Sequence, residues 1–210
     1  MAERRQVSPM LPLDLFRSRA FSAGTAVGLL FNLSLYGSLL CISLFLQRSR
    51  HESAAATGLL ILPMSVAVGA GSFASGRLTA RFGPRLPMIA GLALAAAGAA
   101  VIATVSAASP LGVLLAGSVI LGLCSLAMPA MTSVVVGATG PQHAGVASGV
   151  LNAARQAGGA LGVALLGSLL TGTGHGQHGL AMQVPLSVAA AGLLAAVGLA
   201  WTATRPGSMK

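Results

Sequence analysis

The order of apolar and charged positions divides this chain into long uncharged stretches joined by short charged ones. No Asp, Glu, Lys or Arg occurs within residues 20–47, 53–76, 86–154 or 156–204, where Leu, Val, Ala, Gly and Met predominate. A helix needs about 20 apolar residues to cross the hydrocarbon core of a bilayer. The first two stretches hold one span each, and the last two together hold four. The pattern predicts an all-α membrane protein with six transmembrane helices.

Clusters of glycine, proline and polar residues place the ends of these spans. Pro63 and Pro129 fall inside predicted spans, where neighbouring helices or water can satisfy the carbonyls that a proline leaves without a partner. We expect a cytoplasmic segment 1–19, a six-span membrane domain 20–204 and a cytoplasmic tail 205–210. The spans are expected at about residues 22–46, 54–75, 86–106, 111–137, 144–170 and 184–203.

The distribution of basic residues predicts the orientation. If the loops are counted alternately from an N-terminus placed inside, nine basic residues fall on the inner side and only Arg48 and Arg50 on the outer side, leaving aside Arg155 within a span. Because basic loops stay on the cytoplasmic side, both termini are expected in the cytoplasm of a multi-pass cell-membrane protein. The net charge of +9 comes from these small groups at span ends, so it indicates a lipid bilayer as partner and no nucleic acid.

Residues able to perform chemistry are scarce. Cys41 and Cys124 both lie within predicted spans, where small packing residues are more frequent than disulfides. No phosphate-binding glycine loop or metal-ligand spacing occurs, and all three acidic residues lie outside the spans. The sequence therefore predicts no enzyme, no metal site and no cofactor.

The segment between the second and third spans, residues 76–85, carries three arginines between two glycines. Such arginines can bind helix carbonyls or lipid phosphates, and simple anchoring on the inner side would explain them. The segment also resembles the G-x-x-x-D-R-x-G-R-R loop of the major facilitator superfamily, which links the second and third helices of each six-helix half. The matching positions are Gly76, Arg81, Gly83 and Arg85.

Two positions of this loop depart from the family pattern. Ala80 stands where the family has its acidic residue, and Pro84 stands where it has the first of its paired basic residues. The second-half copy of the loop is typically the degenerate one, so the resemblance implies a C-terminal half. The departure counts against a charge-relay gate at this loop.

Residues 143–167 resemble the penultimate-helix signature of the fourteen-span drug–proton antiporters, with Gly-x-Ala-Ser-Gly followed by Asn, Arg-Gln and a glycine-rich run. Residues 11–17 resemble the lead into the ninth helix of that family. The resemblance implies one half of a major facilitator fold, built from two inverted three-helix repeats, together with an N-terminal transporter half that is missing here.

The signature helix also has a direct physical meaning. Gly145 and Gly149, like Gly158 and Gly162, are four residues apart, so each pair removes side-chain bulk from one helix face and predicts close helix packing. Arg155 at the bilayer centre would cost roughly 2.5–3.5 kcal/mol, so it must snorkel, pair or face a wet cavity. Two interpretations fit the sequence: Arg155 snorkels to the inner headgroups, or it shares a functional role with Asn152 and Gln156.

Polar residues also form stripes on the first and fourth spans. At about 100° per residue, the stripe on the first span covers a sector of about 80°. In the family these two helices line the central path, although small polar residues that only join helices would produce the same pattern. The candidate substrate-path residues are Thr25, Asn32, Tyr36, Ser118, Ser125, Met128, Asn152, Arg155 and Gln156.

A proton-coupled transporter needs a carboxylate within the membrane, and no span here contains one. The resemblance therefore implies part of an efflux antiporter for amphipathic or drug-like small molecules, with its proton site in the N-terminal half. The alternative is a non-transporting membrane fragment or helical scaffold.

Overall fold

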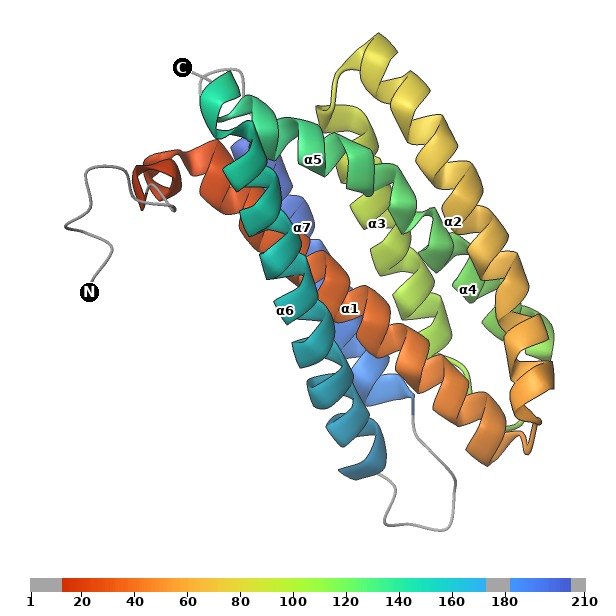
Figure 1. The fold of residues 1–210 in the computed structure, drawn as a ribbon. Coiled ribbons are helices and arrows are strands. Elements are labelled where there is room, and N and C mark those ends of the chain that lie inside the picture. The colour runs from red at the N-terminus through yellow and green to blue at the C-terminus, as the bar shows by residue number, and fades with distance from the viewer. Residues whose placement is uncertain (1–12, 173–181, 205–210) are drawn as a thin grey trace.

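The computed structural model of this 210-residue chain describes residues 13–172 and 182–204. In this part, six helical segments are long and apolar enough to cross a membrane. They form an all-α bundle (Figure 1). The elements are η2 (Leu13–Arg17), α1 (Arg19–Ser49), α2 (Ala54–Phe82), α3 (Arg85–Ala103), α4 (Leu111–Gly122), η3 (Leu123–Leu126), α5 (Ala127–Gly137), η4 (Pro141–His143), α6 (Ala144–Gly172) and α7 (Gln183–Ala203).

Serine caps start the first two long helices. The Ser18 hydroxyl accepts a hydrogen bond from the Phe21 amide at 3.4 Å, and the Ser53 hydroxyl accepts one from the Ala56 amide at 3.1 Å. Each cap satisfies an amide that has no partner within its helix. Both helices begin within about three residues of their predicted starts.

Helices that are distant in sequence make the main contacts. The α1 helix packs on α6 and α7, α3 packs on α7 and α4, and α2 packs on α4 and η3. The first three-helix segment therefore exchanges partners with the second, α1 against α6 and α2 against α4. This interleaving agrees with the expected pair of three-helix repeats.

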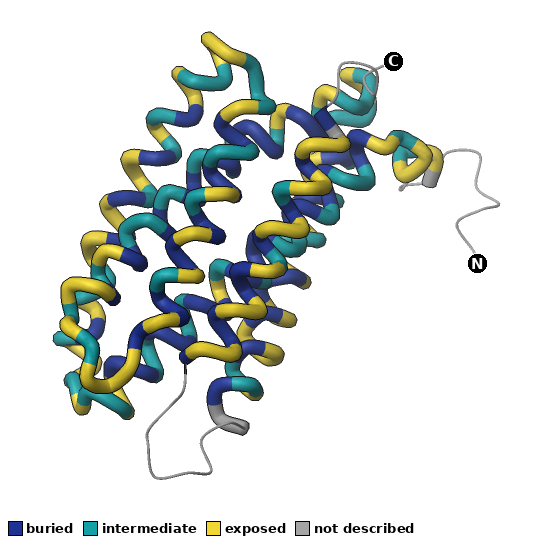
Figure 2. Tube along the Cα trace, turned by 180° about the vertical axis from the view of Figure 1, so that it is seen from behind, coloured by how far each residue is buried: buried dark blue, intermediate teal, exposed yellow. Residues whose placement is uncertain are grey.

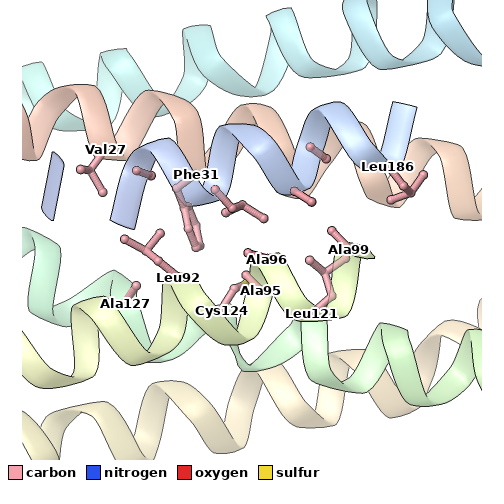
Figure 3. Close-up of a cluster of buried hydrophobic side chains, with 14 of the residues drawn as sticks. Val27, Phe31, Leu92, Ala95, Ala96, Ala99, Leu121, Cys124, Ala127 and Leu186 are labelled. Atoms are coloured by element: carbon pink, nitrogen blue, oxygen red, sulfur yellow. The ribbon is translucent and has the colours of Figure 1, made fainter. Parts of the chain in front are cut away.

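A buried apolar cluster extends across the described spans. Phe31 from α1 is fully buried and points toward Leu92 of α3, with Leu186 of α7 and Leu121 of α4 in the same cluster (Figure 3). The alanine residues of α3 face it and let the backbones approach. In lipid such close packing, rather than hydrophobic exclusion of water, holds helices together.

Large apolar side chains are exposed on the outer face of α2. Leu59, Val66 and Phe73 are each at least two-thirds exposed, and exposed positions follow that helix in Figure 2. A water-soluble domain would bury such side chains, whereas a bilayer or another membrane subunit solvates them. The chain is a multi-pass membrane protein.

The second span is longer than predicted. We expected residues 76–85 to form a turn, but α2 continues to Phe82 and the reversal is confined to Gly83 and Pro84. The Arg, Leu and Ala residues before Phe82 favour helix, and only Gly83, at φ 76°, adopts a conformation that ends it. The turn prediction was therefore wrong for Gly76 and Arg81, which are helical.

The fourth span is not one continuous helix. The 3₁₀ turn η3 separates α4 from α5 within the range predicted as a single helix. Pro129 lacks the amide that would bond to the Ser125 carbonyl four residues earlier, so the turn before the proline tightens. The other predicted ends lie within about three residues of the observed ones.

Candidate functional site

The contact between α1 and α6 is built from backbone rather than side chains. Gly158 lies against the Leu29 carbonyl and Gly162 against the Leu33 carbonyl, so closely that a Cβ on either glycine would overlap an oxygen atom. On the α1 side, a Cβ on Gly37 would lie 2.7 Å from the Gly162 carbonyl oxygen. The small-residue spacing thus brings the two backbones together.

Polar bonds cross the same contact. The Asn32 amide nitrogen donates to the Arg155 carbonyl at 2.9 Å, and the Cys41 thiol donates to the Leu166 carbonyl at 3.7 Å. Asn32 is 5% exposed, so its amide is spent on the neighbouring helix. These bonds fix the register of α1 against α6.

Arg155 lies half-buried at the edge of this contact. A Cβ on Gly28 would lie 3.2 Å from its Cγ atom, so the absence of a side chain on α1 makes room for the arginine stem. Its Nε atom is buried and has no hydrogen-bond partner among the described residues. Because no span carries a carboxylate, the guanidinium can take an anionic or acceptor group supplied from outside this chain.

Polar side chains lie on the face of α6 next to the contact with α1. Asn152 and Gln156 are exposed, and so is Ser148, one turn before them. Residues four apart follow one side of a helix, so these three define what we call the α6 polar face. Ser148 is not among the predicted path residues, although its spacing of four from Asn152 would have identified it.

Tyr36 extends this region onto α1. The tyrosine is 47% exposed, and its Cδ2 atom would lie 3.2 Å from a Cβ on Gly159 of α6. It therefore rests over the glycine-rich part of α6 with its ring edge free. Tyr36, Arg155 and the α6 polar face form one continuous candidate site.

The remaining path candidates lie in helix contacts. Thr25 is buried on α1 two turns before Asn32. Ser118 donates to the Leu114 carbonyl of its own helix at 2.8 Å, and Ser125 lies buried against Gly71 of α2. Met128 is half-buried against the apolar core. The structure does not bring these four to the α6 polar face.

The two glycine pairs of α6 have different surroundings. Gly158 and Gly162 face α1, whereas no described atom lies within 4 Å of a Cβ placed on Gly145 or Gly149. Gly145 and Gly149 therefore leave a stretch of α6 backbone uncovered beside the α6 polar face. Close packing at Gly145 and Gly149 requires a partner other than the described helices.

The arginine-rich end between α2 and α3 contains stacked cations. Arg77 lies 4.0 Å from the ring centroid of Phe73, Arg81 lies 5.3 Å from that of Phe82, and Arg85 lies 4.2 Å from that of Trp201. Gly76 is exposed with no described atom near its Cβ position. No motif signalled Trp201, because its contact depends on α7 returning beside α3.

Among residues 13–172 and 182–204, no group of three potential metal ligands gathers in one place. Among the described side chains, one ion pair joins the exposed Arg17 and Asp14 at 3.7 Å. The polar chemistry of this part of the chain is therefore that of hydrogen bonding and a single intramembrane cation.

Comparison with known proteins agrees with this architecture. Residues 18–210 match the profile of the Major Facilitator Superfamily. The chain is 35% identical over 205 residues to the methylenomycin A resistance protein of Streptomyces coelicolor, covering 96% of this chain and 42% of the relative.

Two further relatives come from Streptomyces glaucescens and Mycobacterium tuberculosis. The tetracenomycin C resistance and export protein of Streptomyces glaucescens is 36% identical over 81% of this chain and 32% of its own length. The multidrug resistance protein Stp of Mycobacterium tuberculosis is 37% identical over 80% of this chain and 31% of its own length. The chain spans less than half the length of these curated relatives, and its match to the family profile covers nearly all of the described residues. This six-span chain belongs to the Major Facilitator Superfamily of transporters.

Proposed function

We propose that this chain forms the C-terminal half of an efflux transporter for amphipathic, drug-like small molecules in the bacterial cell membrane. The observation that carries the proposal is the exposed α6 polar face, formed by Ser148, Asn152 and Gln156, beside Arg155. The resistance and export relatives support the substrate class.

The α6 polar face is unsuited to direct contact with lipid chains. Amide side chains at membrane depth cost free energy unless they meet a polar partner or water. A second membrane domain packed on Gly145 and Gly149 would enclose the α6 polar face and leave a polar channel beside it. Asn152 and Gln156 would then offer hydrogen bonds to a passing molecule, with Tyr36 supplying an apolar ring edge.

Proton coupling is assigned to the other half. No span of this chain carries a carboxylate, and His51 and His143 lie in the connections between helices. Arg155 can pair across the interface with a carboxylate of that half, which would tie the charge of the proton site to the position of α6.

The proposed orientation places both termini in the cytoplasm. In that case the connection between α3 and α4 is outside and the turn between α5 and α6 is inside. A cysteine introduced at the exposed Ala107 should react with a membrane-impermeant thiol reagent in intact cells, whereas one at the exposed Gln142 should react only after lysis. The opposite labelling pattern would show that both termini lie outside the cytoplasm.

The function itself is tested by complementation. In a drug-sensitive bacterial host, this chain would be expressed alone, or with the portion of the methylenomycin A resistance protein that it does not match. Cells with both parts should accumulate less methylenomycin A, tetracenomycin C or fluorescent lipophilic dye than cells with either part. Efflux by this chain alone, or proton flux driven by substrate in liposomes containing it alone, would refute the division of labour.

The second candidate is a helical scaffold that transports nothing. The lack of a carboxylate in any span favours it, because this chain by itself has no proton site. Unchanged drug accumulation when both parts are present in the membrane at equal abundance would support the scaffold.

A further inference from the structure

A hollow lies between the start of α3 and the end of α7, and its lining shares no residue with the α6 polar face. Its volume is about 440 Å³, within the range of roughly 300–1,000 Å³ of small-molecule pockets. It opens to the outside of the bundle. Its lining is Phe82, Arg85, Leu86, Ile89, Ala90 and Trp201.

Arg85 is the only charged member of this lining. Its guanidinium lies over the Trp201 ring, with 4.2 Å from Cζ to the ring centroid, the position in which arginine commonly stacks on an aromatic face. Stacking uses the face of the group, whereas its five N–H donors point outward in the plane. In the described part of the chain, Arg85 forms no ion pair, and the carboxylates of Asp14 and Glu52 belong to other segments.

The rest of the lining is apolar and only partly covered. Phe82 and Leu86 are each about half exposed, at 55% and 50%, and Trp201 is 49% exposed. An apolar groove that opens at the level of an arginine and a tryptophan matches the boundary between headgroups and acyl chains, where tryptophan is enriched. The start of α3 and the end of α7 lie at the same end of the bundle in Figure 1.

We propose that this hollow binds one anionic phospholipid of the leaflet at the arginine-rich end of the bundle. The lipid phosphate accepts hydrogen bonds from the in-plane N–H groups of Arg85, and an acyl chain lies along Leu86, Ile89 and Ala90. Trp201 holds the guanidinium by its face and so aims the donors at the headgroup.

The single tryptophan of the chain reports on this site directly. The purified 210-residue chain in non-ionic detergent would be titrated with phosphatidylglycerol or phosphatidylcholine while Trp201 emission is followed. We expect a saturable change with phosphatidylglycerol at a midpoint about fivefold lower than with phosphatidylcholine, the factor for one cation at an anionic surface.

Two variants and a control separate the contributions. Arg85→Gln should raise the phosphatidylglycerol midpoint to that of phosphatidylcholine. The control is Arg48→Gln, which changes an exposed arginine in the last turn of α1 and should leave the midpoint unchanged. Ala90→Leu keeps every charge but fills the hollow, so it should weaken the binding of both lipids. Lipid retained after purification, measured by mass spectrometry, gives a second readout that does not depend on the fluorescence of the variant.

Three outcomes would overturn the proposal. The first is equal midpoints for the two lipids, and the second is a wild-type midpoint in Arg85→Gln. The third is an equal response to inorganic phosphate without lipid, which would make the site one for a free anion.

Discussion

Two helix contacts occupy corresponding places in this bundle, α1 against α6 and α2 against α4 with η3, and they are built differently. Both rely on glycine and on a side chain that bonds to a carbonyl of the partner, Asn32 to Arg155 in one and Ser75 to Leu126 in the other. In the first, two continuous helices meet backbone to backbone. In the second, the partner helix is broken by a 3₁₀ turn at the contact.

The difference lies in how many backbone groups each contact fixes. Gly158 and Gly162 both touch α1 carbonyls, whereas Gly122 meets the Met64 carbonyl, with 2.6 Å to a Cβ placed on it. Pro63 and Pro129 each remove a helical hydrogen bond near the second contact. The Ser125 hydroxyl there is buried without a partner in the described chain. We infer that the α1–α6 contact is the fixed one, and that the α2–α4 contact can adjust.

The largest effect is expected at Gly162. Gly162→Ala places a Cβ on the Leu33 carbonyl and should destabilise the chain by about 1–3 kcal/mol, the range for overpacking of a tight contact. Gly149→Ala is the matched control on the same helix, because its Cβ meets no described atom, and its melting temperature in detergent should be unchanged or higher. Equal melting temperatures for the two variants would remove the distinction between the faces of α6.

Arg155→Lys should affect transport without affecting the fold. Lysine keeps the charge but lacks the planar fork that pairs with a carboxylate through two hydrogen bonds. Drug efflux by the assembled transporter should fall about tenfold, corresponding to about 1.4 kcal/mol of lost interaction, at unchanged abundance in the membrane. Wild-type efflux from this variant would return Arg155 to a snorkelling, anchoring role.

Gly122→Ala tests the second contact. The added Cβ meets the Met64 carbonyl, but the 3₁₀ turn beside it can shift, so we expect a loss of about 1 kcal/mol, smaller than at Gly162. Gly112→Ala, on the same helix with open space at its Cβ position, is the control for thermal unfolding. A loss as large as that of Gly162→Ala would show that both contacts are fixed.

The smallest effects are expected from the two polar bonds. Asn32→Ala and Ser75→Ala each remove one interhelical hydrogen bond, and such bonds average about 0.6 kcal/mol in membranes. Asn32→Ala should cost more, because its bond lies within a contact that cannot relax. Measured by unfolding in mixed micelles, a greater loss for Ser75→Ala would invert the comparison.

The sequence predicted the six spans because uncharged runs of about 20 residues have few other uses. The spacing of four also indicated the close approach at Gly158 and Gly162, but the same spacing at Gly145 and Gly149 meets no described helix. The sequence did not predict the 3₁₀ break before Pro129, since prolines are tolerated within membrane helices and the backbone response depends on neighbouring helices. Trp201 on Arg85 was unpredictable for another reason, because only the tertiary return of α7 brings two residues so distant in sequence together.

The placement of polar residues was partly predictable. Periodicity grouped Thr25, Asn32 and Tyr36 on one stripe, yet the first two are buried and the third is exposed. A sector of about 80° is wide enough for one edge to face a neighbouring helix while the other remains open. Which edge is covered depends on where α6 lies, and spacing along α1 does not contain that information.

The accessibility of α6 in the assembled transporter tests the central claim most directly. In a background with Cys41 and Cys124 replaced by alanine, single cysteines would be placed at Gln156 on the α6 polar face and at the exposed Ala157, about 100° around the helix. Cysteine at 156 should react with a water-soluble thiol reagent and be protected by transported drug, whereas cysteine at 157 should react slowly and without protection. Equal labelling at both positions, unaffected by drug, would contradict a transport path along α6.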